Sequence, residues 1–248
     1  MRRPARKFTF LSASLLALGL AGTRAIDAQA PAAAATLKPF VARYKVEAFG
    51  FLAGTAEISL ENGAPGEYQY RTTLNPHGLF RFAIPSGATL TTWVRFDGSR
   101  VQPLRYREED GSSDTDKDVA LEFDWTRALV QGTAHDELVR LAVAADTQDP
   151  LSLQLAVLAD LASGREPHGY AMVDKTKVKQ YAYKAEGTAR IPTELGTLDT
   201  VIYSSSRAGS SKVTRVWYAP SLDFTAVRSD DLDDGKVRIR MTILSLKR

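Results

Sequence analysis

The stretch Asp149-Pro150-Leu-Ser-Leu-Gln-Leu-Ala-Val-Leu-Ala-Asp-Leu-Ala-Ser-Gly164 decides the fold that we expect for this chain of 248 residues. Aspartate is a favoured N-cap residue and proline is favoured at the first helical position, so Asp149 and Pro150 predict the start of a helix. Glycine often ends a helix, and Gly164 predicts that end. Apolar side chains cover more than half of the helix circumference, which is typical of a buried helix. We therefore predict one buried apolar helix at about 150–163.

On both sides of this helix, apolar and polar residues alternate with the period of two that is typical of β-strands. Asp233-Asp234-Gly235-Lys236 lies between two such runs and is a strong hairpin signal. The expected strands lie at about 40–48, 56–60, 68–74, 88–97, 101–108, 118–124, 128–131, 177–183, 188–191, 198–204, 212–218, 224–229 and 237–246. The predicted fold class is mainly β: a single antiparallel, strongly curved sheet or partly open barrel, with the helix packed in its concave side.

The first thirty residues have the organisation of a secretory signal peptide. Four basic residues lie within Met1–Lys7, an apolar run extends from Phe8 to about Ala21, and small residues lead to Ala28-Gln29-Ala30. The apolar run is too short to cross a bilayer of about 30 Å as a helix. The segment therefore predicts export, and we expect a periplasmic location.

The cleavage position is open, because Pro31 directly after Ala30 is an unfavourable neighbour and a cut as late as residue 35 also fits. We divide the chain into a signal peptide at 1–30, a flexible leader at 31–38 and a single β-rich domain at 39–248. The chain contains no cysteine, which argues against a lipoprotein anchor, disulfides and thiolate metal sites. No second apolar run approaches the length of a membrane span, so we expect a soluble protein rather than an integral membrane protein.

The net charge of the chain depends on the predicted signal peptide. The full chain has 32 basic and 29 acidic residues. Five of the bases and one of the acids lie within the first thirty residues (Arg2, Arg3, Arg6, Lys7, Arg24 and Asp27). The remainder carries 27 bases against 28 acids, a net charge near −1. The excess of positive charge belongs to the export signal, so we expect no nucleic-acid partner.

Several motifs in a fixed order resemble one family of bacterial exported proteins. Asp149-Pro150 heads the leucine-rich helix, and Ile191-Pro192-Thr-Glu-Leu-Gly196 follows about thirty residues after its end. Val216-Trp217-Tyr218-Ala219-Pro220 then leads through Val227-Arg228 to a terminal strand pair, and near the front Tyr44 precedes Gly54-Thr-Ala56. This order is similar to that of domain of unknown function (DUF) 3108. The resemblance implies an exported β-rich domain and brings no activity or catalytic residues. Ala226 stands where the family usually has proline.

Metal and catalytic motifs are incomplete in this sequence. His77, His135 and His168 lack the close spacing of metal ligands. Asp114-x-Asp116-x-Asp118 lacks the glycine and glutamate that an EF-hand would place at Val119 and Trp125. The acidic run 230–234 is open to the same calcium interpretation, and as a cluster of exposed acids it would mark a loop tip. There is no Gly-x-Ser-x-Gly elbow, and no pair of carboxylates stands out for glycosidase chemistry. We expect no catalytic residue, metal or cofactor.

Aromatic side chains on successive strands are the best candidates for a functional site. Either they fill the core around the helix, or they line a groove that takes an acyl chain or another hydrophobic ligand. The candidate ligand-binding residues are Tyr44, Tyr70, Phe80, Trp93, Leu155, Leu158, Trp217 and Arg228. The favoured function is a non-enzymatic envelope protein that binds a lipid, another hydrophobic small molecule or an envelope protein. A structural module that pairs through a sheet edge, and an unrecognised hydrolase, remain alternatives.

Overall fold

The computed structural model describes residues 36–82, 87–112 and 115–248. These residues belong to one compact unit, Ala33–Arg248. The predicted signal peptide, the zone of alternative cleavage up to residue 35 and Asp114 of the first acidic motif all lie outside the described residues. Three residues of the predicted leader, Thr36, Leu37 and Lys38, are described, and the last two contact the domain. Leu37 is 3% exposed, and the Lys38 ammonium lies 2.9 Å from an Asp223 carboxylate oxygen.

Fourteen strands form one antiparallel sheet in the order β8-β7-β6-β5-β4-β3-β2-β1-β14-β13-β12-β11-β10-β9. The elements are β1 (Phe40–Ala48), β2 (Phe51–Asn62), β3 (Glu67–Pro76), η1 (Gly78–Phe82), β4 (Thr89–Phe96), β5 (Val101–Glu109), β6 (Val119–Asp124), β7 (Leu129–Ala134), β8 (Glu137–Ala142), α1 (Ser152–Ala162), β9 (Gly169–Asp174), β10 (Lys177–Thr193), β11 (Gly196–Ser206), β12 (Lys212–Ala219), η2 (Pro220–Leu222), β13 (Thr225–Asp233) and β14 (Lys236–Lys247). The first and last strands of the chain, β1 and β14, are paired at the centre of the sheet.

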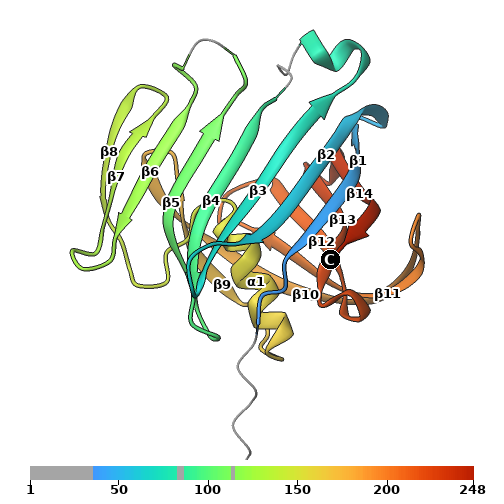
Figure 1. Ribbon diagram of the computed structural model, residues 1–248. Helices are drawn as coiled ribbons and strands as arrows, with labels where there is room; N and C mark the ends of the chain where they lie inside the picture. The colour runs from blue at the N-terminus through green and yellow to red at the C-terminus, as the bar shows by residue number, and fades with distance from the viewer. Residues whose placement is uncertain (1–35, 83–86, 113–114) are drawn as a thin grey trace, which may run out of the picture. The chain divides into compact units, whose positions relative to one another are not determined.

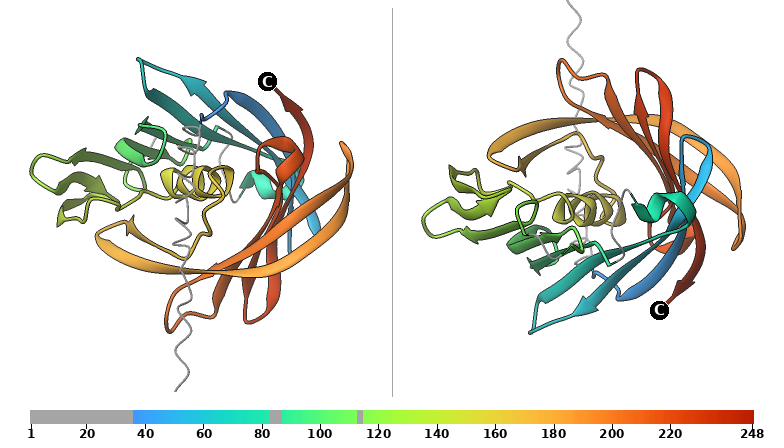
Figure 2. Two further views of the ribbon diagram at one scale, coloured as in Figure 1. Left: turned by 90° about the horizontal axis from the view of Figure 1, so that it is seen from below. Right: turned by 90° about the horizontal axis from the view of Figure 1, so that it is seen from above.

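The sheet curves around α1, which is the only α-helix among the described residues (Figures 1 and 2). Its two edge strands, β8 and β9, do not pair with each other, so the sheet stays open. The helix is buried on most sides, and Leu155 and Val157 on different faces are 1% and 0% exposed. The predicted fold class, a curved antiparallel sheet or partly open barrel around one buried helix, is confirmed.

The helix begins at Ser152, two residues later than Asp149 and Pro150 predict. Asp149 nevertheless caps the chain there, because its Oδ1 accepts hydrogen bonds of 2.8 Å from the backbone N–H groups of Leu151 and Ser152. Residues 150 and 151 form a turn that leads into the helix. Gly164 ends the helix with a φ of +70°, a left-handed conformation that glycine adopts without steric cost.

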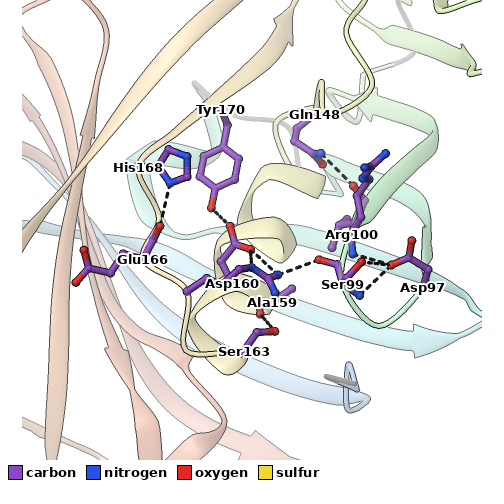
Figure 3. Close-up of polar contacts among 12 residues, drawn as sticks. Asp97, Ser99, Arg100, Gln148, Ala159, Asp160, Ser163, Glu166, His168 and Tyr170 are labelled. Atoms are coloured by element: carbon purple, nitrogen blue, oxygen red, sulfur yellow. Dashed lines mark hydrogen bonds and ion pairs between the residues drawn. The ribbon is translucent and has the colours of Figure 1, made fainter. Parts of the chain in front are cut away.

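Polar contacts fix the C-terminal end of the helix to the sheet (Figure 3). Asp160 accepts a hydrogen bond of 2.5 Å from the Tyr170 hydroxyl on β9. The Arg165 guanidinium donates to Asp160 and also, over 2.9 Å, to the backbone carbonyl of Ser99 in the β4–β5 turn. That turn is held by Asp97, whose carboxylate accepts hydrogen bonds from the backbone of Ser99 and Arg100. The helix is therefore attached to two separate parts of the sheet.

Most expected strands are present, and the differences have local causes. β8 is not among the expected strands, because only Val139 of its residues is buried and the alternation is weak. β9 is not among them either, although Ala171, Met172 and Val173 are all buried. The two short runs expected at 177–183 and 188–191 are one strand, β10, because a β-bulge at Ala185/Gly187 carries the ladder across the interruption.

The acidic run 230–234 does not mark a loop tip throughout, because Asp230 to Asp233 belong to strand β13. Asp230 is 3% exposed, and its carboxylate accepts hydrogen bonds from the guanidinium groups of Arg228 and Arg240. Strand alternation explains this pairing, since both arginines lie on the same sheet face as Asp230 in neighbouring registers. Of the residues in this acidic run, only Asp234 lies in the turn between β13 and β14.

Candidate ligand cavity

A cavity of about 320 Å³ lies between α1 and the concave face of the sheet. It is lined by Phe40, Tyr44, Ile58, Tyr70, Thr72, Leu90, Leu151, Gln154, Leu158, Tyr183, Ser205, Thr214, Val216, Tyr218, Thr225, Ala226, Arg228, Ser229, Asp231 and Met241. Its volume is within the range of about 300–1,000 Å³ that is usual for small-molecule sites. The concave side of the sheet is therefore not completely filled by the helix.

Strand alternation and register place the tyrosines of the cavity on one face. Tyr44 on β1 is opposite Ile243 of β14, and two residues further along Val46 is opposite Met241, which also lines the cavity. A bulge between Trp217 and Tyr218 places Tyr218 opposite Ala226, another lining residue. Residues two apart on a strand share a face, so these side chains converge from both sides of the β1–β14 pair.

The cavity lining is apolar near the helix and polar on strands β11–β13. Phe40, Leu151 and Leu158 form part of the apolar lining. Ser205 is opposite Thr214 in the ladder, and Thr214 is opposite Asp231. The Thr214 hydroxyl donates a hydrogen bond of 2.7 Å to an Asp231 carboxylate oxygen. Apolar walls with a few polar groups at one place are the usual composition of sites for amphipathic ligands.

The tyrosine hydroxyls in the cavity differ in whether they have hydrogen-bond partners. The Tyr44 hydroxyl donates over 2.8 Å to the backbone carbonyl of Ala226, and the Tyr70 hydroxyl donates over 3.2 Å to Gln154 Oε1 on the helix. Tyr218 is 6% exposed, and its hydroxyl makes no hydrogen bond to any residue that the structure describes. The Tyr218 hydroxyl oxygen is not among the buried unpaired atoms of the described residues, so it faces the open space of the cavity and is available to a ligand.

Burial keeps these tyrosines neutral. Burial raises the pKa of Tyr44 and of Tyr70 far above the usual value for tyrosine. Burial also raises the pKa of Tyr218, with additional repulsion from the phenols of Tyr183 and Tyr70, and it raises the pKa of Tyr183 to about 12. At neutral pH the cavity therefore offers neutral hydroxyl donors and acceptors rather than phenolate nucleophiles.

Four of the eight predicted site residues line the cavity: Tyr44, Tyr70, Leu158 and Arg228. The guanidinium of Arg228 is engaged by Asp230, to which its Nη2 donates over 2.5 Å. It also lies 4.4 Å above the ring of Trp217, its register partner on β12. The structure thus brings Tyr44, Tyr70 and Leu158 together, whereas the Arg228 side chain lies on the other face of the sheet with Trp217 and Asp230.

The other four predicted site residues lie outside the cavity lining. Trp217 is next to Tyr218 on β12 and so faces the other side of the sheet. Leu155 is 1% exposed within the core. Trp93 on β4 is half-buried beneath the Arg105 guanidinium at 4.6 Å, and Phe80 belongs to η1 beyond the end of β3.

Sequence reasoning missed several lining residues, of which Tyr218, Tyr183 and Gln154 contribute polar atoms. The aromatic pattern of the sequence contains both Trp217 and Tyr218, and only Trp217 is among the predicted site residues. Tyr218 alternates with Val216 and Thr214, which also line the cavity, so the period of two along β12 carries a signal for it. Helical spacing does carry a signal for Gln154, because it stands four residues before Leu158 and shares its face.

Among residues 36–82, 87–112 and 115–248, no three histidine or acidic side chains come together as a metal-binding group. The ring of His168 contacts the backbone carbonyl of Glu166, and His77 donates its backbone N–H to the carbonyl of Ala53. His135 lies in the β7–β8 turn with a positive φ of 51°. The same part of the chain has no helix long and apolar enough to cross a membrane.

The model of one protein family matches residues 41–242, which is most of the domain described above. The chain belongs to the family "Protein of unknown function (DUF3108)". The resemblance of its ordered motifs to DUF3108 is thereby confirmed. No curated protein matches the chain.

Solved structures resemble this DUF3108 chain in fold at low sequence identity. A β-barrel-like protein of domain of unknown function DUF1849 from Brucella abortus aligns with a TM-score of 0.54 and 9% identity, over 84% of this chain and 97% of that one. A putative exported protein with a YmcC-like fold from Bacteroides fragilis has a TM-score of 0.40 and 9% identity, over 86% and 98% of the two chains. The MucA/MucB complex of Pseudomonas aeruginosa has a TM-score of 0.37 and 12% identity, and the match spans 84% of this chain and 51% of that one. Only the first similarity is high enough to support the fold.

Proposed function

We propose that this DUF3108 protein is a non-enzymatic periplasmic protein of the cell envelope that binds an amphipathic, largely hydrophobic molecule in the cavity beside α1. The periplasmic location rests on the predicted signal peptide. The observation that carries the ligand proposal is the unfilled space of about 320 Å³ on the concave side of the sheet. A protein core of ordinary packing density leaves few voids larger than a water molecule, so a space of this size needs an explanation.

The composition of the lining supports one class of ligand. Apolar side chains such as Phe40, Ile58 and Leu158 suit an acyl chain or a comparable hydrocarbon. The Tyr218 hydroxyl, together with Ser205 and Thr214, suits an uncharged polar group such as an ester or a hydroxyl. The Arg228 guanidinium is not available to a ligand head group, because it is paired with Asp230 on the face of the sheet that carries Trp217.

A ligand-binding measurement tests this function. Protein purified without detergent is extracted and its lipids are identified by mass spectrometry, and delipidated protein is titrated with a fluorescent fatty acid. Leu158→Trp places a larger side chain in the cavity from a half-buried position, and we expect it to weaken the binding of the probe about tenfold. Leu155→Met, a volume-conserving change on the same helix outside the lining, is the matched control and retains binding. Absence of both co-purified lipid and probe binding would refute the proposal.

The second candidate function is pairing of a partner strand with edge strand β8. The observation that favours it is Leu138, which is 88% exposed on this edge strand. Lysine on an edge strand opposes pairing with another chain. Leu138→Lys is expected to abolish a complex formed through this edge and to leave fatty-acid binding unchanged, so the two functions are separable.

A further inference from the structure

We propose that one end of the sheet is a membrane-docking surface that inserts apolar side chains into the surface of a lipid bilayer. The surface, called here the apolar rim, consists of Phe49, Phe51, Leu52, Leu79, Val237 and Ile239. These side chains are 65%, 72%, 57%, 81%, 37% and 41% exposed, respectively. The inference goes beyond ligand binding and does not depend on it, because none of the six residues lines the cavity.

Three segments that are far apart in the sequence come together to form the apolar rim. The β1–β2 turn is joined to the β13–β14 hairpin by a hydrogen bond of 2.8 Å from the Phe49 N–H to the Arg238 carbonyl. The segment before η1 is joined to β2 by a hydrogen bond of 2.7 Å from the His77 N–H to the Ala53 carbonyl. Register also places Ile239 opposite Ala48. The exposed side chains therefore gather at one end of the sheet, with Phe51 and Ile239 on one face and Leu52 on the other, and apolar clusters of this kind mark interaction sites.

The turn that carries Phe49 has a backbone conformation that is unfavourable for a bulky residue. Phe49 has a φ of +53° and Gly50 a φ of +84°, so both turn residues are in the left-handed region. Two-residue hairpins of this kind strongly favour Asn-Gly or Asp-Gly, and a bulky aromatic residue there is an outlier. The Phe49 side chain is 65% exposed, so burial does not compensate for the unfavourable conformation. Strain of this kind often lies at functional positions, and the result here is an aromatic ring held at the tip of a hairpin.

The apolar rim lies at the end of the strands away from α1. The helix lies near the start of β1, because Leu158 of the helix and Phe40 of β1 both line the ligand cavity and also a second cavity. Figure 1 shows the β1–β2 turn and η1 at the opposite end of the strands from the helix. The polar part of the cavity extends toward that end, since Asp231 of its lining is the register partner of Ile239. A bilayer bound at the apolar rim would thus face the part of the cavity that the helix does not cover.

A lipid bilayer fits this surface better than a folded partner does. The apolar side chains project from separate turns, and a fluid bilayer accommodates such projections without matching their shape. Basic groups accompany them: the Arg238 guanidinium lies 5.9 Å from the centre of the Phe49 ring, and Arg81 and Lys236 belong to the same segments. Arginine and lysine beside inserted apolar residues attract anionic lipid head groups. Asp234 in the β13–β14 turn opposes this attraction, so apolar insertion has to supply much of the affinity.

Co-sedimentation with vesicles of phosphatidylethanolamine and phosphatidylglycerol tests the proposal, using the chain without its predicted signal peptide. The wild-type protein is expected to bind, and Phe51→Ser combined with Leu79→Ser is expected to bind at least about tenfold more weakly. Leu195→Ser, at a position 37% exposed in the β10–β11 turn, is the matched control and retains binding. Replacement of phosphatidylglycerol by phosphatidylcholine is expected to weaken the binding in part.

Phe49→Asn separates docking from folding, because asparagine tolerates the left-handed conformation of that turn. We expect this variant to melt at a higher temperature than the wild type and yet to bind vesicles more weakly. The proposal is overturned if the wild type does not bind vesicles, or if the control loses binding as strongly as the rim variant. Self-association is the alternative outcome. It replaces the proposal if light scattering shows that the wild type is a dimer, that Phe51→Ser dissociates this dimer, and that the wild type does not bind vesicles. Fatty-acid binding by the rim variants is expected to be unchanged, so failure here leaves the cavity proposal standing.

Discussion

The Thr92 hydroxyl on β4 donates a hydrogen bond of 2.6 Å to Asp149 Oδ2 at the start of the helical segment. Both side chains are completely buried, at 0% exposure. The other carboxylate oxygen of Asp149 accepts from the N–H groups of Leu151 and Ser152. One carboxylate thus connects the sheet to the helix that forms a wall of the cavity.

The first prediction concerns the pH dependence of stability that Asp149 causes. Burial raises the pKa of Asp149 to about 6, against the opposing effect of its hydrogen bonds from Thr92, Ser152 and Leu151. The folded state therefore holds a proton between pH 3.8 and about 6 that the unfolded state has released. Stability then falls as the pH rises through this interval, by roughly 3 kcal/mol in total. We expect urea unfolding at successive pH values to show this decrease.

Asp149→Asn is the control, because an amide keeps a cap acceptor and cannot ionise. Its free energy of unfolding is expected to change less between pH 5 and 7 than that of the wild type. Asp149→Ala removes the cap of the Leu151 and Ser152 N–H groups and one of the two acceptors of the Thr92 hydroxyl, so we expect it to cost about 3 kcal/mol. A pH profile that is the same in the wild type and in Asp149→Asn would contradict the prediction.

The second prediction has the opposite sign and concerns Asp230. Burial disfavours its charged form, but hydrogen bonds from Arg240 and Arg228 outweigh burial and hold the pKa of Asp230 below 3.8. Its contribution to stability is therefore present above the unfolded-state pKa and is lost as the pH falls through the lower folded-state pKa. Asp230→Asn is expected to cost about 2 kcal/mol at pH 7, since Arg240 is half-exposed and water screens its charge.

The difference between the wild type and Asp230→Asn should shrink in strongly acidic solution, where the wild-type carboxylate also becomes neutral. Chemical unfolding of both proteins at neutral and at acidic pH measures it. Asp231→Asn is a useful comparison, because the neighbouring carboxylate accepts its hydrogen bond from the neutral Thr214 hydroxyl. An undiminished difference at low pH would mean that the ion pairs with Arg228 and Arg240 are not its cause.

The third prediction distinguishes two tyrosines of the cavity. Tyr218→Phe removes a hydroxyl that makes no hydrogen bond to the described residues, so its effect on the free energy of unfolding should be small. Tyr44→Phe removes the donor to the Ala226 carbonyl and is expected to cost about 1 kcal/mol. Ligand binding should respond in the reverse way, with Tyr218→Phe weakening the binding of a fatty-acid ester more than Tyr44→Phe does. Thermal unfolding and probe titration of both variants measure the two effects.

The sequence permits a correct prediction of the fold class because the decisive signals are local. Asp149 and Gly164 bound an apolar helix, and Asp233-Asp234-Gly235-Lys236 does form the turn between β13 and β14. Edge strands are harder to predict, because they bury few residues and their alternation is incomplete. β8, in which Val139 is the only buried residue, shows this difficulty.

The cavity is predictable only in part, because its lining comes from strands and a helix that are far apart in the sequence. Alternation alone assigns Tyr44 to the concave face, and helical spacing assigns Leu158 to the helix surface that faces the sheet. Alternation with Val216 and Thr214 also places Tyr218 rather than Trp217 on the cavity side, but the sequence does not show which of the two faces of β12 is concave. The pairing of Arg240 with Asp230 depends on the register between β13 and β14, which the sequence does not show either.

The fourth prediction concerns Gly54, the glycine of the Gly-x-Ala motif in β2. A Cβ atom at this position would lie 2.3 Å from the carbonyl oxygen of Asn75 and 2.9 Å from the Cα of Pro76 on β3. Both are backbone atoms, so relief of the overlap requires movement of the strand pair near the β1–β2 turn. We expect Gly54→Ala to cost about 3 kcal/mol, the upper end of the usual effect of overpacking.

Gly235→Ala is the matched control, since Gly235 in the β13–β14 turn also has a positive φ, of 73°, but a Cβ atom there would meet no other atom within 4 Å. Alanine at this position has to adopt a left-handed conformation without a steric overlap, which is expected to cost about 1 kcal/mol. Urea unfolding of the two variants measures the difference between them. If both variants lose the same stability, backbone conformation alone explains the glycine at position 54. If Gly54→Ala loses about 2 kcal/mol more, the close approach of β2 to β3 requires glycine at that position.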